Sequence, residues 1–314
     1  MGVSEKTDLR NIMVETFIKA VKEGINLVVV VGDSTSTSKI APFQELYPER
    51  VVNVGIAEQN LVGISVGLSL SGYVSVTANA APFLIARSNE QVKNDVCYSE
   101  TNVKLFGLNA GVAYGSLGST HYAIDDISIM LGLGNIKIFA PSDPVETEQI
   151  VLYALKNKGP MYIRMDNGLF PYLHNKEYRF TPGKVDILRH GSDVTLISLG
   201  SLVNKAYKAS LDLEKESIDV ELLNIPSIRP LDRDGILNSI LKTKKVVTVE
   251  EHSLHGGIGS LTAEIIAENK LDTDFIRLGI TEGQFSKAGP RDQIRSYYGI
   301  DRKGIYNTIK KILK

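Results

Sequence analysis

The stretch Val54–Gly67, VGIAEQNLVGISVG, decides the fold of this chain. A short β-branched run at residues 51–54 leads into an apolar segment that predicts a helix over residues 57–71. This helix is rich in Gly and Ser, which lets neighbouring backbones approach closely. Glu58 stands alone as a carboxylate at its start. The helix dipole favours a Glu there, and the small, apolar neighbourhood also suits a carboxyl group that takes part in proton chemistry.

Short strands alternate with helical segments around this stretch. Leu27–Val31, LVVVV, is apolar on both faces, which is typical of a buried strand in a parallel sheet. A helix is expected over residues 8–23, and another begins after Ser142 as its N-cap, with Pro144 and Glu146 near its first turn. Further strands are expected at residues 51–54, 73–77, 103–108, 137–140 and 161–164. The alternation predicts an α/β domain with a mostly parallel sheet.

A second domain is expected, since the 314 residues suffice for about two domains. Residues 166–190 are rich in turn formers, aromatic residues and charge, which indicates an ordered linker. A second α/β pattern follows, with strands expected at 194–199, 220–225, 245–250 and 274–278 and helices at 202–216, 232–243, 259–269 and 304–313. We therefore predict two α/β domains, at residues 1–180 and 190–314.

The composition excludes several classes of protein. With 35 Lys+Arg against 36 Asp+Glu the net charge is −1, so we expect no whole-chain attraction to nucleic acid or to anionic membranes. The single cysteine, Cys97, excludes an internal disulfide and a multi-cysteine metal site. The apolar runs are too short to span a bilayer, and the charged start, MGVSEKTDLRN, lacks an apolar targeting segment. We expect a cytoplasmic chain.

A family resemblance emerges from several motifs in order. Ile56-Ala57-Glu58-Gln59-Asn60, followed by the Gly/Ser-rich helix, resembles the pyrimidine-binding domain of transketolases and other thiamine diphosphate enzymes. The same family is matched by GDSTST (32–37), PFLIARSNEQVKND (82–95), GSTHYAIDDI (118–127), APSDPVETEQ (140–149) and VVTVEEHSLHGGIGS (246–260). The resemblance covers about residues 8 to 310. It implies a pyrimidine-binding domain followed by a transketolase-type C-terminal domain.

The family's metal and diphosphate motif is missing. Related enzymes hold both groups with a Gly-Asp-Gly motif and a later Asn, whereas here Gly32-Asp33 is followed by Ser34. A divalent cation needs several oxygen ligands, and we assign no metal ligand to this chain. The resemblance therefore implies a split transketolase with thiamine diphosphate and Mg²⁺ as cofactors. A separate N-terminal subunit carries the GDG…N motif and mainly holds the metal and the diphosphate. Two such pairs would form an α2β2 heterotetramer.

The resemblance assigns cofactor-binding roles to four residues. Glu58 matches the catalytic Glu that hydrogen-bonds atom N1′ of the cofactor's pyrimidine ring, and Ile56 lies beside it. Phe83 matches an aromatic side chain that packs on that ring, although a core Phe is the alternative. Arg87 begins the family's R-x-x-E-Q pattern, for which a role in the cofactor pocket or in subunit contact is expected.

Substrate-binding residues are also implied. His121 lies in Gly118-Ser119-Thr120-His121, which resembles a motif whose imidazole reaches the hydroxyls of the donor ketose, so we class it as catalytic and substrate-binding. A lone His is otherwise usually structural. Three residues resemble a clamp for the substrate phosphate, in which guanidinium groups bind phosphate through two donors: Arg10, Thr37 and Arg164. Taken alone, each arginine would more often form a surface salt bridge.

Two positions in the substrate site depart from the family. Asn109 stands where transketolases have a His that helps to bind phosphate, and Leu117 stands where they have an Asp that contacts an acceptor hydroxyl. Leu117 cannot accept a hydrogen bond. The departures therefore predict a modified or deoxy sugar rather than an ordinary pentose phosphate.

The resemblance implies an enzyme of carbohydrate metabolism. It would transfer a two-carbon ketol unit from a ketose or ketose phosphate to an aldehyde. A deoxyxylulose-phosphate-synthase-like or 2-oxo-acid-decarboxylating β subunit stays open as an alternative. A non-catalytic scaffold subunit is a second alternative, against which the retained Glu58 argues. Glu250, Glu251, His252 and His255 resemble a metal cluster at first sight, but their loose spacing favours a structural role.

Overall fold

The computed structural model describes residues 6–33 and 35–314, which form two compact α/β units. The first unit comprises the chain up to Ala110 together with residues 129–180. The second comprises residues 111–128 and 181–314. The predicted fold class is confirmed, because each unit contains its own largely parallel sheet. The units differ from the expected limits of 1–180 and 190–314 in that residues 111–128 are grouped with the second unit.

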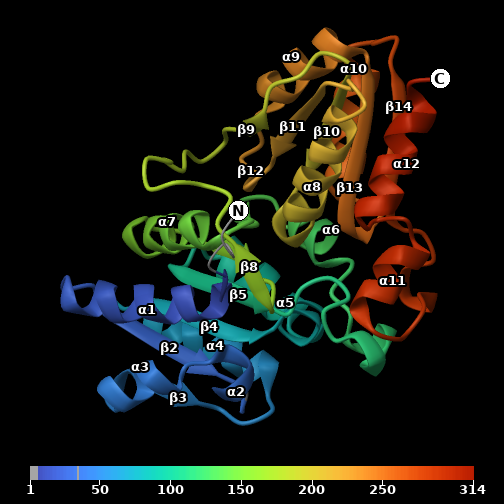
Figure 1. Ribbon diagram of the computed structural model, residues 1–314. Coiled ribbons are helices and arrows are strands. Elements are labelled where there is room, and N and C mark those ends of the chain that lie inside the picture. Colours follow the sequence, from blue (N-terminus) through green and yellow to red (C-terminus); the bar gives the residue numbers. More distant parts are fainter. Residues whose placement is uncertain (1–5, 34) are drawn as a thin grey trace. The chain divides into compact units, whose positions relative to one another are not determined.

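The first unit is built on a parallel sheet with the strand order β6-β7-β5-β4-β2-β3 (Figure 1). Its strands are β2 (Leu27–Val31), β3 (Val51–Asn53), β4 (Val74–Ala80), β5 (Val103–Leu108), β6 (Lys137–Phe139) and β7 (Met161–Arg164). They confirm every strand expected for this unit, with small shifts at the ends. A separate antiparallel pair joins β1 (Lys6–Asp8) to β8 (Leu169–Pro171), the second of which lies in the expected linker.

Helices and helical turns connect these strands. The α-helices are α1 (Leu9–Lys22), α2 (Thr35–Ser38), α3 (Ala41–Leu46), α4 (Glu58–Leu70), α5 (Asn89–Gln91) and α7 (Pro144–Lys156). Two π-helical turns, Phe83–Arg87 and Val92–Tyr98, flank α5. A further helix, α6 (Asp126–Leu131), contains residues of both units.

The two faces of this sheet are covered by different helices. On one face Phe17 of α1 packs edge-on against Phe106 of β5, with ring centroids 5.3 Å apart, in a core that also includes residues of α3 and α7. Helix α4 packs on β2 and β4, and its Leu61 and Val62 are fully buried outside that core cluster. Ala78 of β4 belongs to the core under α1. Because successive side chains alternate across a strand, the adjacent Asn79 faces α4.

The start of α7 differs from the expectation. Asp143, rather than Ser142, is the N-cap residue, and its carboxylate accepts a hydrogen bond from the backbone amide of Glu146 at 2.8 Å. Ser142 instead donates through its amide and its hydroxyl to the Glu146 carboxylate, at 2.8 and 2.7 Å. Burial raises the pKa of Glu146. The expected cap was therefore wrong by one residue, because Ser142 serves the side chain of Glu146.

The second unit contains a five-stranded sheet of order β14-β13-β10-β11-β9, in which β9 is antiparallel to β11 and the other pairs are parallel. The strands of this sheet are β9 (Asp186–Arg189), β10 (Val194–Ser198), β11 (Val220–Asn224), β13 (Lys245–Ser253) and β14 (Asp274–Ile280). A further short strand, β12 (Ser227–Arg229), lies outside this sheet. The helices of the unit are α8 (Val203–Glu214), α9 (Arg233–Thr243), α10 (Ile258–Glu268), α11 (Arg291–Tyr297) and α12 (Arg302–Ile312). The expected elements are confirmed, whereas β9, β12 and α11 were not predicted.

The segment 111–128 belongs to the second unit because its apolar residues enter that unit's core. Val112, Tyr122 and Ile124 are buried in the cluster formed by β10, β11 and β13 with α8 and α12. Gly111 and Ala123 exchange two backbone hydrogen bonds of 2.9 Å, which close the loop between them. This loop contains Leu117 and His121. Among the described residues no helix combines the length and apolar character needed to cross a bilayer.

Lys104 of β5 is fully buried, and its burial leads to a prediction about the pH dependence of stability. Its ammonium group donates to the carbonyl oxygens of Asn157 and Gly159, at 2.8 and 2.5 Å. Burial, with a smaller contribution from the nearby charge of Lys137, lowers its pKa from 10.5 to about 7. Between these two pH values the unfolded chain binds more protons at this site than the folded chain. The free energy of unfolding therefore rises with pH across this interval.

We expect Lys104→Met to remove this rise. The difference in unfolding free energy between the variant and the wild type should change with pH between 7 and 10, by at most about 1.4 kcal/mol per pH unit. Urea denaturation at several pH values measures it. Lys158→Met, in the exposed loop that Lys104 caps, is the control and should follow the wild type. Parallel pH profiles for Lys104→Met and the wild type would contradict the expectation.

Candidate active site

The loop before α4 is shaped so that Glu58 becomes the first residue of that helix. Asn53 at the end of β3 accepts hydrogen bonds through Oδ1 from the backbone amides of Asp33 and Gly55, both at 3.0 Å. Gly55 has φ +72°, a left-handed conformation that favours glycine. A Cβ on Gly32 would lie 3.2 Å from the carbonyl oxygen of Gly55. Close backbone approach thus sets the start of α4 at the carboxyl edge of the sheet.

Glu58 is 3% exposed, and both of its carboxylate oxygens have partners. Asn79 of β4 donates to Oε1 at 3.4 Å, and Arg87 donates through Nη1 to Oε2 at 2.5 Å. The sequence suggested apolar surroundings for Glu58, but the structure also places two polar partners beside its carboxylate. Sequence reasoning missed Asn79. Its signal was the polar residue at every second position of β4, at Ser75, Thr77 and Asn79.

Phe83 and Arg87 reach Glu58 from the π-helical turn Phe83–Arg87. The guanidinium carbon of Arg87 lies 4.8 Å from the centroid of the Phe83 ring, which is a cation–π contact. One extra residue in such a turn redirects side chains, and π-helical turns are frequent at functional sites. Three of the four predicted cofactor residues are therefore brought together: Glu58, Phe83 and Arg87. Ile56, the fourth, is 76% exposed on the surface of this unit.

A second group of predicted residues gathers around Arg10 at the start of α1. Its guanidinium donates through Nε and Nη2 to the two carboxylate oxygens of Asp8, at 3.0 and 2.7 Å. Nη1 donates to the carbonyl oxygen of Thr37 at 3.0 Å and to Oδ1 of Asn109 at 3.3 Å. Arg10 thus contacts Thr37 and Asn109, two other residues of the predicted substrate site. Thr37, however, contributes its backbone carbonyl to this group.

Sequence reasoning missed two charged members of the group. Asp8 is the N-cap of α1 and is 5% exposed, and Lys39 lies 3.2 Å from its carboxylate. Burial alone would raise the pKa of Asp8, but the hydrogen bonds and charge of Arg10, with Lys39, lower it below the ordinary value. An Asp directly before a helix is an N-cap signal, which could have identified Asp8. With two cations and one carboxylate, the group carries one net positive charge.

Arg164 lies at the same edge of the sheet. It ends β7 opposite Gly107 of β5, two residues before Asn109, and it is 5% exposed. Asn109 itself has φ +57°, a left-handed conformation that Asn adopts more readily than most residues. Both side chains therefore stand where parallel strands end, a common location of ligand sites in α/β sheets.

His121 and Leu117 lie in the second unit, on the loop that the Gly111–Ala123 bridge closes. They occupy two 3-10 turns, Gly115–Leu117 and Ser119–His121, separated by Gly118 with φ +80°. Thr120 Oγ1 lies 3.0 Å from Nδ1 of His121, which fixes one edge of the imidazole. The Leu117 side chain is 58% exposed. Leu117 thus presents an apolar surface close in sequence to the imidazole.

Hydrogen bonds to Glu251 and to Lys287 help to hold this loop in place. Glu251 of β13 accepts a hydrogen bond from the backbone amide of Val112 at 2.9 Å. The same carboxylate pairs with Arg291 at 2.7 Å and with Nε of Arg295 at 2.6 Å. Tyr122 donates through its hydroxyl to the carbonyl oxygen of Lys287 at 3.2 Å. The loop geometry around His121 therefore depends on a buried carboxylate that two arginines neutralise.

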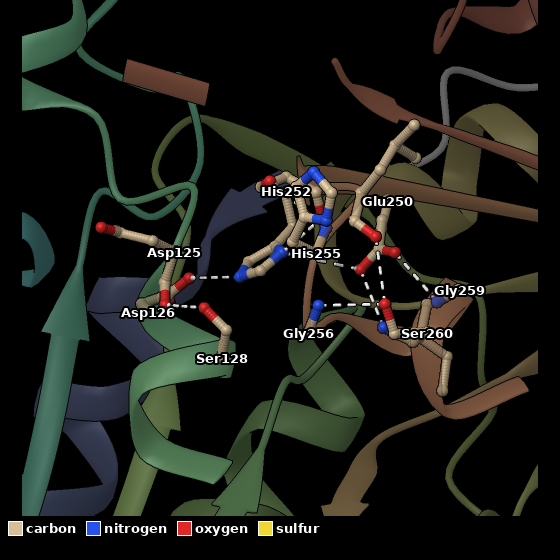
Figure 2. A network of polar contacts seen from close by, with 12 residues as sticks. Asp125, Asp126, Ser128, Glu250, His252, His255, Gly256, Gly259 and Ser260 are labelled. Atoms are coloured by element: carbon tan, nitrogen blue, oxygen red, sulfur yellow. Dashed lines mark hydrogen bonds and ion pairs between the residues drawn. The ribbon is translucent and has the colours of Figure 1, made fainter. Parts of the chain in front are cut away.

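The neighbouring acidic and histidine residues of this segment have structural partners. Figure 2 shows the Glu250 side chain of β13 reaching the start of α10. Its carboxylate accepts hydrogen bonds from the amides of Ile258 and Gly259, both at 2.9 Å. His252 is buried, with Nε2 3.9 Å from a carboxylate oxygen of Asp126. A carboxylate that caps a helix favours the structural role expected for this motif.

Comparison with known families accounts for both units. The family described as "Transketolase, pyrimidine binding domain" matches residues 5–171, and "Transketolase, C-terminal domain" matches residues 183–305. A solved structure described as "Split gene transketolase, inactive beta4 tetramer" is similar with a TM-score of 0.87 and 32% identity, covering 98% of each chain. A transketolase structure from Campylobacter jejuni, 16% identical with a TM-score of 0.82, shares the fold over 98% of this chain and 47% of its own.

Curated relatives agree with this assignment. The chain is 54% identical over 303 residues to a subunit of "Apulose-4-phosphate transketolase" from Actinobacillus succinogenes, covering 96% of this chain and 97% of the relative. It is 30% identical over 304 residues to "6-deoxy-6-sulfo-D-fructose transketolase subunit SqwH" of Clostridium sp., covering 97% and 94%. It matches 47% of the 1-deoxy-D-xylulose-5-phosphate synthase of Halothermothrix orenii at 33% identity. The chain therefore belongs to the transketolase family of thiamine diphosphate enzymes, as a subunit that contains the pyrimidine-binding and C-terminal domains.

Proposed function

We propose that this chain is the pyrimidine-side subunit of a split transketolase that transfers a two-carbon ketol unit from a ketose phosphate to an aldehyde. The observation that carries the proposal is the buried Glu58 carboxylate at the head of α4, with the Phe83 ring beside it. The names of the relatives, which are transketolase subunits, support the same activity.

The residues around Glu58 fit the pyrimidine half of thiamine diphosphate. A buried carboxyl group can share a proton with a ring nitrogen, and an aromatic face can stack on the ring. In the structure Glu58 and Phe83 already bind a planar, nitrogen-rich cation, the guanidinium of Arg87. The chain has no GDG motif, so the diphosphate and a Mg²⁺ ion are assigned to a partner subunit with a GDG…N motif.

When bound, thiamine diphosphate supplies the carbanion chemistry, and the protein supplies orientation and electrostatics. Glu58 holds a proton at its carboxyl group and shares it with atom N1′ of the pyrimidine. Glu58 is buried, as are Leu61 and Val62 on the next turn of α4, and this burial keeps water from that proton. His121 hydrogen-bonds the hydroxyls of the donor ketose, and Thr120 sets the orientation of its imidazole.

The Arg10 group is proposed to bind the substrate phosphate. Because Asp8, Thr37 and Asn109 occupy several donors of Arg10, this guanidinium acts chiefly through its charge and through the orientation of Asn109. Lys39 and Arg164 supply further donors at the same edge of the sheet. The phosphate in the name of the 54% identical relative supports this assignment.

Apulose 4-phosphate is the donor we propose first. Two relatives, 54% and 34% identical, carry that substrate in their names. The apolar Leu117 and the neutral Asn109 support a substrate that lacks the hydroxyl pattern of an ordinary pentose phosphate. The similarity to deoxyxylulose-phosphate synthase keeps that reaction as the second candidate, to be separated by assay with pyruvate as donor.

The partner and the assembly are part of the proposal. The relatives are named as subunits, which supports a second, N-terminal chain. The similar split-gene transketolase is described as an inactive beta4 tetramer, which agrees with a need for that second chain. We propose an active α2β2 heterotetramer, located in the cytoplasm.

The isolated chain should bind thiamine diphosphate and Mg²⁺ more weakly than micromolar and show no ketol transfer, because the diphosphate and metal ligands belong to the partner. Calorimetry with the isolated chain, and then with the reconstituted pair, measures this. Micromolar or tighter binding by the chain alone would contradict the split-site proposal.

Glu58→Gln should slow exchange of the cofactor's C2 proton by at least about 100-fold, since general acid–base contributions are commonly of that size or larger. Hydrogen exchange followed by NMR in the reconstituted complex measures the rate. The exposed Glu45→Gln is the control and should leave the rate unchanged. Equal exchange in Glu58→Gln and the wild type would assign Glu58 a structural role.

Leu117→Asp should shift the substrate preference toward ribose 5-phosphate as acceptor. The wild type leaves an acceptor hydroxyl against an apolar side chain, which costs about tenfold to a few hundredfold in kcat/KM. The measurement is kcat/KM for ribose 5-phosphate and a 2-deoxy analogue, with apulose 4-phosphate as donor. Leu241→Asp, at an exposed leucine of the same unit, is the control. A wild-type preference for ribose 5-phosphate over the deoxy analogue would refute this specificity.

A further inference from the structure

Arg87 occupies two contacts at once that the proposed function reserves for the cofactor. Its Nη1 lies 2.5 Å from Oε2 of Glu58, and its guanidinium carbon lies 4.8 Å from the centre of the Phe83 ring. Glu58 is the group that would hold the pyrimidine nitrogen, and Phe83 is the ring that would stack on the pyrimidine. The guanidinium of Arg87 therefore contacts both Glu58 and Phe83.

The guanidinium is chemically close to the group it would exclude. Both the guanidinium and an aminopyrimidine are flat and rich in nitrogen, present N–H donors at one edge, and stack on an aromatic face. A carboxylate accepts hydrogen bonds from either. One carboxylate and one ring face cannot serve both groups with the same atoms.

Burial makes the Glu58–Arg87 pair asymmetric. The Glu58 side chain is 4% exposed and that of Arg87 is 47% exposed. The carboxylate is thus fixed in the protein, while the guanidinium can swing out into solvent without unfolding the site. Arg87 ends the π-helical turn that begins with Phe83, so its guanidinium would move away from the Phe83 ring as it turns toward solvent.

We propose that Arg87 is a self-inhibitory placeholder for the pyrimidine: it neutralises the buried Glu58 carboxylate and must leave both Glu58 and Phe83 before the cofactor binds. This inference rests on the proposed function of Glu58. It changes the role expected for Arg87 from a residue that binds the cofactor to one that competes with it. Glu58 is thereby never buried without a counter-charge before the site is loaded.

Arg87→Ala in the reconstituted two-subunit complex should tighten the binding of thiamine diphosphate with Mg²⁺ by about three- to tenfold, the combined size of a partly exposed ion pair and a cation–π contact. Titration calorimetry measures the Kd without reference to turnover. Arg87→Lys keeps the charge but loses the planar guanidinium, so its Kd should lie between those of the wild type and Arg87→Ala. Lys93→Ala removes an exposed cation from the same stretch of chain and should leave the Kd unchanged.

A double-mutant cycle isolates the competition from a general effect on the site. In a Glu58→Gln background Arg87 loses the carboxylate that holds it, so Arg87→Ala should then change the Kd by less than about twofold. If Arg87→Ala with Glu58 retained binds thiamine diphosphate with an unchanged or higher Kd, the placeholder role is wrong. The proposed function would stay intact. A reconstituted wild-type complex that binds no thiamine diphosphate would refute the proposed function itself.

Discussion

The burial of the Glu58 carboxylate at the head of α4 is the constraint on which the rest of the first unit depends. An ionised carboxyl group removed from water needs hydrogen bonds and a counter-charge. The fold supplies both, through Asn79 on the adjacent strand and Arg87 on the π-helical turn. Close backbone packing at Gly32 and Gly55 then fixes where the helix begins. The candidate cofactor site is the result of these requirements acting together.

Buried carboxylates with arginine partners recur beyond this site. Asp8 holds Arg10 with two hydrogen bonds and thereby orders the candidate phosphate group. Glu251 holds Arg291 and Arg295 and fixes the amide of Val112, from which the His121 loop starts. In each case the carboxylate accepts hydrogen bonds from arginine and from a backbone amide. We regard these acids as positioning residues, because removing either would leave its partly or fully buried arginine partners without that counter-charge.

The two departures from the family gain meaning from their positions. Asn109 accepts a hydrogen bond from Arg10, a role that a neutral amide oxygen performs without neutralising the cation. Leu117 is exposed on its own unit and presents carbon where the family presents a carboxylate. Each change lowers the polarity at its own position, and the Arg10 group keeps its positive charge. A phosphorylated but less conventionally hydroxylated sugar fits that balance.

The sequence by itself determined the family, the alternation of strands and helices, and the identity of Glu58, Phe83, Arg10 and His121 as candidates. These follow from local patterns: apolar runs set the strands, and short motifs set the resemblance. Only the tertiary structure decided the partners of those residues. Asn79, Asp8, Lys39 and Glu251 are ordinary polar residues in the sequence. The first three acquire roles because the fold of the first unit brings their segments together, and Glu251 does so because β13 lies beside the segment 111–128 within the second unit. The contact between Arg87 and Glu58, 29 positions apart, likewise depends on the packing of α4 against β4 and the π-helical turn, which no local pattern encodes.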